Sequence, residues 1–309
     1  MANSIEQEIG RRRTFAIISH PDAGKTTLTE KFLLYGGAIN TAGSVKGKAN
    51  SKHAVSDWME IEKERGISVT SSVLQFEYEG KCINILDTPG HEDFSEDTYR
   101  TLMAADSAVM VIDASKGVEK QTIKLFKVCV MRHIPIFTFI NKMDREANDP
   151  FELLDEIENV LGIATCPINW PIGCGKEFKG VYDRKQREVS LFKAAMNGQK
   201  EVATKNIALD DPELKAEIGD AYLSKLDEDV ELLDGASAEF DLAKVQAGDL
   251  TPVFFGSALT NFGVETFLQH FLDMTTSPLP RNSSAGPIDP FKEDFSAFVF
   301  KIQANMNKA

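Results

Sequence analysis

Short runs of apolar residues alternate with amphipathic segments along most of the 309-residue chain. Continuous apolar runs are typical of buried strands, and apolar residues spaced three or four apart are typical of helices. The expected strands are 14–19, 69–78, 82–86, 108–113, 134–140 and 252–255, and the expected helices are 26–35, 119–132, 150–161 and 264–274. This alternation predicts an α/β fold with a mostly parallel sheet that is covered by helices on both faces.

One strand is expected to run against the others. Residues 69–78 alternate between apolar and polar, Glu79 and Gly80 are suited to a turn, and residues 82–86 return. Such a hairpin predicts one antiparallel edge strand in the sheet. The preceding segment, 36–68, is rich in Gly, Asn, Ser and Lys, and we expect a long loop there with a short helix near 57–63. Loops of this length are commonly functional or mobile.

The strand–helix alternation is interrupted after Gly162. Residues 164–192 contain two short β-like pieces around the turn segment GCGKEFKG, and an acidic helical stretch follows. We therefore expect one main domain at 1–162 and 251–276 with an inserted α+β subdomain at 163–250. Residues 277–293 are rich in Pro, Gly and Ser, which is typical of a linker. The sequence FSAFVFKIQAN predicts a strand. We expect this strand to begin a β-barrel-like second domain at 294–309, and the chain to end shortly after that domain starts.

Composition is that of an ordinary globular protein, with 42% hydrophobic and 26% charged residues. No apolar run approaches the roughly 18 residues that span a bilayer, and the N-terminus lacks the apolar centre of a secretory signal. These observations predict a cytoplasmic protein with no membrane partner. The four cysteines form no C-x-x-C pair, and we expect reduced, mostly buried thiols.

Negative charge is concentrated in one segment of the chain. Residues 206–250 carry 13 carboxylates against 3 lysines, a local charge of −10, which leaves −3 of the total −13 for all other residues. A net negative charge disfavours broad, sequence-independent binding to nucleic acid, including DNA. An acidic run is usually a solvated helical face. Our alternative hypothesis is that it contacts another protein instead of RNA, because RNA phosphates would repel it.

The first chemical motif is ISHPDAGKTT at residues 18–27, between an expected strand and an expected helix. A phosphate-binding loop reads G-x-x-x-x-G-K-[ST]; Gly24, Lys25 and Thr26 supply its end, whereas Ser19 replaces its first glycine. Serine is small enough for that position if its backbone angles are ordinary. Amides at a helix N-terminus favour an anion, Lys25 can reach the β- and γ-phosphates, and Thr26 offers a hydroxyl to Mg²⁺. The alternative is a chance G-K-T before a helix.

Three further motifs also follow apolar strands directly. In DTPGH, Asp87 is suited to hold Mg²⁺ through water, and Gly90 can donate its N–H to a γ-phosphate oxygen. In NKMD, Asp144 can accept two hydrogen bonds from guanine, a pattern that adenine does not offer. The fourth motif is SAL, where the N–H of Ala258 is suited to bind guanine O6. Because carboxyl ends of parallel strands share one edge of a sheet, all four motifs are expected to meet there.

These motifs resemble those of translational GTPases, and most closely the bacterial class II peptide chain release factors. The matching stretches are SHPDAGKTT, SDWMEIEKERGIS, DTPGHEDFSEDTYRTL, NKMDRE, WPIGCGKEFKGVYD and TPVFFGSALTNFGV. The first position of the phosphate loop need not be glycine in that family, which is consistent with Ser19. Members also carry an insertion between the NKMD and SAL motifs. Part of the similarity is shared with elongation factor G, so an elongation or ribosome-protection GTPase is the close alternative.

The resemblance implies a P-loop GTPase domain that hydrolyses GTP to GDP, with Lys25, Gly90 and His91 as catalytic residues and His91 orienting the attacking water. The residues expected at the nucleotide are Ser19, His20, Pro21, Asp22, Ala23, Gly24, Lys25, Thr26, Thr27, Asp87, Thr88, Pro89, Gly90, His91, Asn141, Lys142, Asp144, Ser257, Ala258 and Leu259. The expected Mg²⁺ ligands are Thr26, Ser68 and Asp87. Ser68 stands where most translational GTPases have threonine, and Thr70 is a competing candidate.

By the same resemblance, a monomer would act in translation termination by recycling class I release factors, which read stop codons. No arginine is clearly placed to stabilise the transferring phosphate, although Arg65 is a candidate. An external activator is therefore implied, and the resemblance makes it the ribosome. Two hypotheses from other classes stay open: a P-loop ATPase or kinase, and a binding module that does not hydrolyse its nucleotide.

Overall fold

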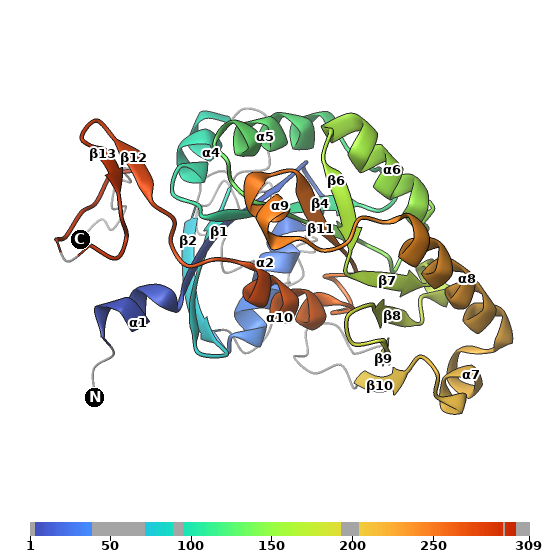
Figure 1. The fold of residues 1–309 in the computed structure, drawn as a ribbon. Coiled ribbons are helices and arrows are strands. Elements are labelled where there is room, and N and C mark those ends of the chain that lie inside the picture. The colour runs from blue at the N-terminus through green and yellow to red at the C-terminus, as the bar shows by residue number, and fades with distance from the viewer. Residues whose placement is uncertain (1–3, 39–71, 89–94, 193–203, 293, 301–309) are drawn as a thin grey trace, which may run out of the picture.

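A computed structural model defines the fold and describes residues 4–38, 72–88, 95–192, 204–292 and 294–300 (Figure 1). Seven strands form the main sheet. In sheet order they are β2 (Ser72–Tyr78), β3 (Lys81–Asp87), β1 (Arg12–Ser19), β4 (Ser107–Asp113), β5 (Ile136–Asn141), β11 (Leu250–Phe255) and β6 (Ala164–Pro167). All neighbouring pairs are parallel except β2 with β3. This confirms the predicted α/β fold with one antiparallel edge strand.

Helices cover both faces of this sheet (Figure 1). One face packs against α4 (Ser95–Leu102), α5 (Lys120–Met131) and α6 (Pro150–Leu161), and the other against α2 (Lys25–Tyr35), α9 (Leu242–Ala247) and α10 (Val264–Met274). Successive strand residues divide between the two cores: Ile18 and Met110 lie in the first, whereas Ile17 and Val111 lie in the second. Burial on both faces explains why these strands are continuous apolar runs.

The inserted region contains more β-structure than its sequence predicts. Residues 164–192 form four strands instead of two short pieces: β6, β7 (Asn169–Ile172), β8 (Gly180–Asp183) and β9 (Glu188–Phe192). The last three join β10 (Thr204–Ala208) in an antiparallel sheet, and η2 (Gly175–Glu177) lies between β7 and β8. Strands of four or five residues carry too little periodicity to be recognised alone. The acidic stretch is helical, as predicted, in α7 (Pro212–Ile218), α8 (Asp220–Ala236) and α9.

The boundaries of the inserted unit stay a prediction, and the sheet topology bears on where it starts. β6 pairs in parallel with β11, with Ala164 opposite Leu250, so it extends the main sheet. The separate antiparallel sheet begins at β7. We therefore propose that the inserted unit starts at Asn169 rather than at residue 163.

Both ends of the described chain differ from expectation. Helix α1 (Ile5–Gly10) was not predicted, although Ser4 and Gln7 form a capping box, which is a sequence signal for a helix N-terminus. Within the expected linker, β12 (Arg281–Ser283) and β13 (Gly286–Ile288) form a short hairpin. Residues 295–300 do not form the expected strand, and Phe295 is 94% exposed. A strand needs a neighbour for its backbone hydrogen bonds, and none of the described residues supplies one there.

Candidate functional site: the carboxyl edge of the sheet

Polar residues from five neighbouring segments gather at the carboxyl edge of the main sheet. Lys25 follows β1, Asp87 ends β3, Asp113 ends β4, Asn141 ends β5 and Ser257 follows β11. The strands β3, β1, β4, β5 and β11 are consecutive and parallel, so their ends lie side by side. Open α/β sheets bind ligands outside this edge.

The phosphate loop has the backbone that the altered motif requires. Ser19 keeps ordinary backbone angles, whereas positive φ values fall at Asp22 (65°) and Gly24 (97°). Ser19 therefore replaces a glycine without backbone strain. Gly24 cannot be replaced so easily, because a Cβ atom there would lie 2.2 Å from Asn141 Nδ2. Pro21, Thr26 and Thr27 are half-buried, the last two in the first turn of α2.

Lys25 is paired with Asp87 in this structure. The ammonium lies 2.5 Å from Asp87 Oδ1 and also contacts the Thr88 carbonyl. Both side chains are buried, Asp87 completely. Asp87 Oδ2 is buried too and has no hydrogen-bond partner among the described residues. The Thr88 hydroxyl donates to the Ile17 carbonyl at 2.5 Å, which fixes the end of β3 to β1.

Asn141 ties three loops together. Its Nδ2 donates to the Ala23 carbonyl in the phosphate loop at 2.7 Å. Its Oδ1 accepts from the backbone N–H groups of Lys142 at 2.8 Å and Ala258 at 2.9 Å. The predicted partner of the Ala258 N–H was guanine O6, and in this structure that N–H faces Asn141. The NKMD and SAL segments and the phosphate loop are thus held in one arrangement.

Asp144 lies beside the SAL segment. Its Oδ1 accepts from the Ser257 hydroxyl at 2.5 Å, and its Oδ2 is 4.0 Å from Arg145 Nε. The Asp144 side chain is 16% exposed. Leu259, the last residue of SAL, is 41% exposed.

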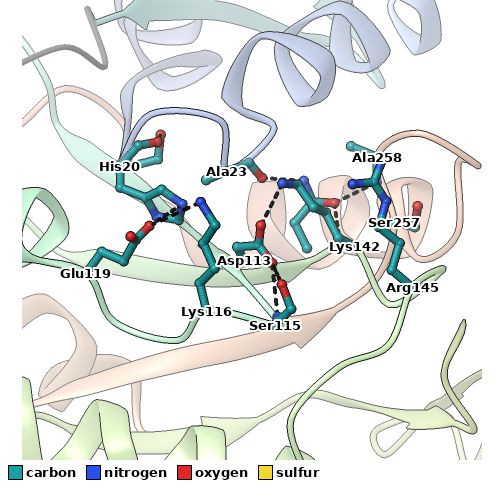
Figure 2. A network of polar contacts seen from close by, with 12 residues as sticks. His20, Ala23, Asp113, Ser115, Lys116, Glu119, Lys142, Arg145, Ser257 and Ala258 are labelled. Carbon is teal, nitrogen blue, oxygen red and sulfur yellow. Dashed lines mark hydrogen bonds and ion pairs between the residues drawn. The ribbon is translucent and has the colours of Figure 1, made fainter. Parts of the chain in front are cut away.

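The loop between β4 and α5 contributes residues that our sequence reasoning missed. Asp113 Oδ2 lies 2.6 Å from Lys142 Nζ, and Asp113 Oδ1 accepts from the Ser115 N–H and hydroxyl (Figure 2). Burial alone would raise the pKa of Asp113, but hydrogen bonds from Lys142 and Ser115 outweigh it and lower this pKa. The available signal was its position, since Asp113 is the last residue of a buried strand, as Asp87 and Asn141 are.

The same loop reaches the phosphate loop at its other end. Glu119 Oε2 lies 2.5 Å from His20 Nε2, and the two side chains point toward one another in Figure 2. His20 is almost completely buried. Burial lowers the pKa of His20, although the Glu119 carboxylate opposes the shift. Through Asp113 and Glu119, this one loop contacts both the NKMD segment and the phosphate loop.

Several predicted residues lie outside the described parts of the chain. These are Ser68, with its competitor Thr70, and Pro89, Gly90 and His91. The short helix expected near 57–63 lies outside them as well. Their roles therefore stay predictions.

Comparison with known proteins identifies the family of this domain. Residues 10–277 match the family model described as "Elongation factor Tu GTP binding domain". The chain belongs to this family. The match covers residues of both the main domain and the inserted region.

Several curated relatives of this elongation factor Tu-type domain share one name. "Peptide chain release factor 3" of Symbiobacterium thermophilum is 62% identical over 99% of this chain and 58% of the relative. Proteins of the same name from Cyanothece sp. and Synechocystis sp. are 59% and 58% identical over 98% and 97% of this chain. The chain spans little more than half the length of these relatives, 58% of the first and 56% of the second.

A solved structure is similar to the elongation factor Tu-type domain in fold. The crystal structure of a protein from Thermus thermophilus matches with a TM-score of 0.68 over 86% of this chain and 40% of that chain. The two sequences are 24% identical, so this likeness concerns the fold alone. Within the described residues, no helix is both long and apolar enough to span a membrane.

Proposed function

We propose that this domain binds GTP with Mg²⁺ and hydrolyses it to GDP and phosphate. The observation that carries the proposal is the hydrogen bond of 2.7 Å from Asn141 to the Ala23 carbonyl. It joins the segment that contains Asp144 to the loop that contains Lys25. A base acceptor and a phosphate-binding lysine are therefore held at one edge of the sheet, as a single nucleotide requires.

Selectivity for guanine rests on Asp144. Its carboxylate can accept from both N1–H and the exocyclic amine of guanine, and adenine would leave this acceptor unpaired. Ser257 donates to one of its oxygens and holds the carboxylate in place. Lys142, two positions before Asp144, is held by an ion pair with Asp113 at 2.6 Å. This supports a site built for one base.

The residues present fit a magnesium ion. Mg²⁺ prefers oxygen ligands and binds with triphosphates through one or two protein groups. Asp87 offers a buried oxygen with no hydrogen-bond partner among the described residues, and Thr26 lies in the first turn of α2. We propose that Thr26, Asp87 and Ser68 hold the ion, which would neutralise charge on the phosphates.

Catalysis would depend on positioning and on charge neutralisation. Lys25 would leave Asp87 and bind the β- and γ-phosphates, and the loop amides near Gly24 would bind them as well. We propose that Gly90 donates its N–H to the γ-phosphate and that His91 orients the attacking water. Loss of the γ-phosphate would release the segment from Gly90 onward and so change the shape of the protein.

For the whole protein we propose a role in translation termination. The relatives at 58–62% identity that are named "Peptide chain release factor 3" support it over an elongation factor G-like role. The proposed partners are the ribosome, as activator, and class I release factors, whose recycling GTP would drive. We propose that the protein acts as a cytoplasmic monomer. Release-factor binding, compared with stimulation of translocation, separates the two roles.

The test is nucleotide turnover by the native chain and by Asp144→Asn, with GTP, ATP and xanthosine triphosphate. We expect the native chain to hydrolyse GTP but neither of the other two nucleotides. The rate should be about 10⁻⁴ to 10⁻² per second without ribosomes and faster with them. Asp144→Asn should shift preference toward xanthosine triphosphate, because the amide can donate to the carbonyl that replaces the exocyclic amine. Equal use of ATP, or an unchanged preference in the variant, would favour an ATPase or kinase instead.

A further inference from the structure

The inserted unit meets the main sheet at Asn169, the first residue of β7. Strand β6 pairs with β11 only as far as Val253, so Phe255, the last residue of β11, has no β6 residue opposite it. The side chain of Asn169 takes that place. Its Oδ1 accepts from the Phe255 N–H at 2.7 Å, and its Nδ2 donates to the Phe255 carbonyl at 3.1 Å.

This side-chain amide replaces a strand neighbour. A carboxamide carries a donor and an acceptor, as a peptide group does, so Asn169 can satisfy both backbone groups of Phe255. Asn169 is 0% exposed. A buried backbone group without a partner costs free energy, and at this depth no bulk water replaces the amide. One side chain of the inserted unit therefore fixes the end of β11 on the side away from β5.

The end of β11 leads directly to the proposed base-binding residues. Gly256 follows Phe255, and its carbonyl accepts from the Met143 N–H at 3.1 Å. Ser257 comes next, and its hydroxyl donates to Asp144 Oδ1 at 2.5 Å. The position of the Asp144 carboxylate thus depends on where β11 ends.

The turn after β7 supports the same two segments. The Gly175 N–H donates at 2.8 Å to the carbonyl of Met143, directly before the proposed base acceptor. The ring centroid of Phe178 lies 5.1 Å from that of Phe262. The backbone of Phe262 in turn exchanges hydrogen bonds of 2.8 and 3.0 Å with Ser257. The inserted unit therefore contacts both the NKMD segment and the SAL segment.

We infer that the inserted unit positions the carboxylate that selects guanine, with Asn169 as the positioning residue. Asn169 holds the end of β11, β11 places Ser257, and Ser257 orients Asp144. The inference rests on the proposed GTPase function and gives the inserted unit a part in its base selectivity. A purely structural Asn169 would affect stability alone, whereas a positioning residue also affects the preference for guanine over a base that lacks the exocyclic amine.

Inosine diphosphate is the probe, because its base lacks only that amine. Displacement of a fluorescent GDP derivative measures the affinities for GDP, inosine diphosphate and ADP. The native chain should bind GDP about ten- to 100-fold more tightly than inosine diphosphate, since a hydrogen bond to a charged acceptor is lost. Asn169→Ala should reduce this ratio at least about three-fold, because hydrogen bonds weaken steeply as their geometry degrades.

The native and variant ratios separate the two claims. A native chain that binds ADP as tightly as GDP would refute the proposed guanine site, and the inference with it. A native chain that prefers GDP, together with an unchanged ratio in folded Asn169→Ala, would refute the inference alone.

Thr251→Val is the matched control on the same strand. Thr251 is also 0% exposed, and its hydroxyl is bonded to the Thr138 hydroxyl and the Ile136 carbonyl, both at 2.9 Å. Loss of these bonds should lower stability to urea and leave the ratio of GDP to inosine diphosphate affinity unchanged. An equal fall of this ratio in Thr251→Val and Asn169→Ala would show that it follows general destabilisation, and would overturn the inference.

Gly175→Ala tests the second support, and it decides the matter if Asn169→Ala does not fold. Gly175 has a φ of +62° in a half-exposed turn, so a side chain strains the turn without opening the core. The ratio should fall about two-fold, less than in Asn169→Ala, because the N–H donor is kept. Gly80→Ala, at a φ of +75° in the turn between β2 and β3, applies the same strain elsewhere. An unchanged ratio in Gly175→Ala, or an equal fall in Gly80→Ala, would contradict the inference.

Discussion

The Lys25–Asp87 ion pair is nearly inaccessible to water, with Lys25 6% and Asp87 0% exposed. Removal of one partner from a buried pair leaves the other charge uncompensated. The two residues are therefore coupled in folding as well as in the proposed chemistry. A bound triphosphate would give Lys25 a new anionic partner and leave Asp87 free to face Mg²⁺.

Lys25→Ala should lower the free energy of unfolding by about 3–5 kcal/mol in the absence of nucleotide, because Asp87 would remain charged and buried. Urea denaturation measures this loss. The double variant Lys25→Ala with Asp87→Ala should be more stable than the single one, since it removes the unpaired charge. Equal stability of the single and double variants would show that the pair is not coupled.

At the scale of elements, α10 is held by an aromatic cluster that crosses several strands. Phe267 is fully buried, and its ring lies 4.9 Å from that of Phe254, 5.3 Å from Phe139 and 5.4 Å from Phe271. Stacking and edge contacts of this kind add to the gain from burial. The cluster positions α10, which follows the SAL segment.

Phe267→Ala should destabilise the protein by about 3–5 kcal/mol, because a large side chain would be replaced by a cavity. Val130→Ala on α5, where the side chain is 44% exposed, should change stability by less than about 0.5 kcal/mol. Thermal and urea unfolding of both variants provide the measurement. A small loss for Phe267→Ala would mean that α10 repacks freely.

A buried pair links α10 to the inserted unit. His270 Nε2 and Asp183 Oδ2, at the end of β8, lie 2.5 Å apart, and the Lys185 and Gln186 amides donate to Asp183 Oδ1. Burial opposes ionisation of Asp183, but these hydrogen bonds prevail and hold its pKa below the ordinary value of 3.8. The unfolded chain therefore binds a proton at higher pH than the folded chain does.

This pKa direction predicts how the pair affects stability with pH. Its contribution is fully present above the unfolded pKa, near 4, and is lost as the pH falls through the lower folded value. His270→Gln should therefore be less stable than the native chain at pH 6, and the difference should shrink in acid. Urea denaturation at several pH values between about 6 and 3 tests it. A difference that is constant over this range would argue against a stabilising contact between His270 and ionised Asp183.

At the scale of the whole molecule, the acidic insertion presents a row of solvated carboxylates on α8. Asp227, Glu228 and Glu231 are exposed on this helix, while Leu226, Val230 and Leu233 face the core. Our hypothesis is that the exposed carboxylates contact a basic ribosomal protein and increase the rate at which the two proteins associate.

Neutralising Asp227, Glu228 and Glu231 together should slow ribosome-stimulated GTP turnover about three- to ten-fold at low salt, with little effect at high salt. Turnover without ribosomes should not change, which separates this hypothesis from the proposed GTPase activity. Neutralising the exposed Glu146, Glu152 and Asp155 of the main domain removes the same charge and is the control. Equal effects of the two sets would contradict a specific contact.

Local signals in the sequence determined much of the fold and the proposed site. Helices 150–161 and 264–274 were predicted with the bounds that the structure gives, because their apolar periodicity is a property of the segment itself. The first of them also has local start and stop signals. Asp149 and Pro150 begin α6, and Gly162 ends it in a left-handed conformation. The buried strands and the motifs after them were readable for the same reason.

Only the tertiary structure decided features that depend on distant neighbours. The sequence did not reveal that β6 pairs with β11, or that Asp113 pairs with Lys142 and Glu119 with His20. The partner of a short strand or of a single carboxylate depends on which distant segment of the chain lies beside it in the fold. The hydrophobic periodicity of the segment itself does not indicate that partner. Helix ends and buried strands are determined by residues close in sequence, whereas strand partners and ion pairs are determined only when the sheet assembles.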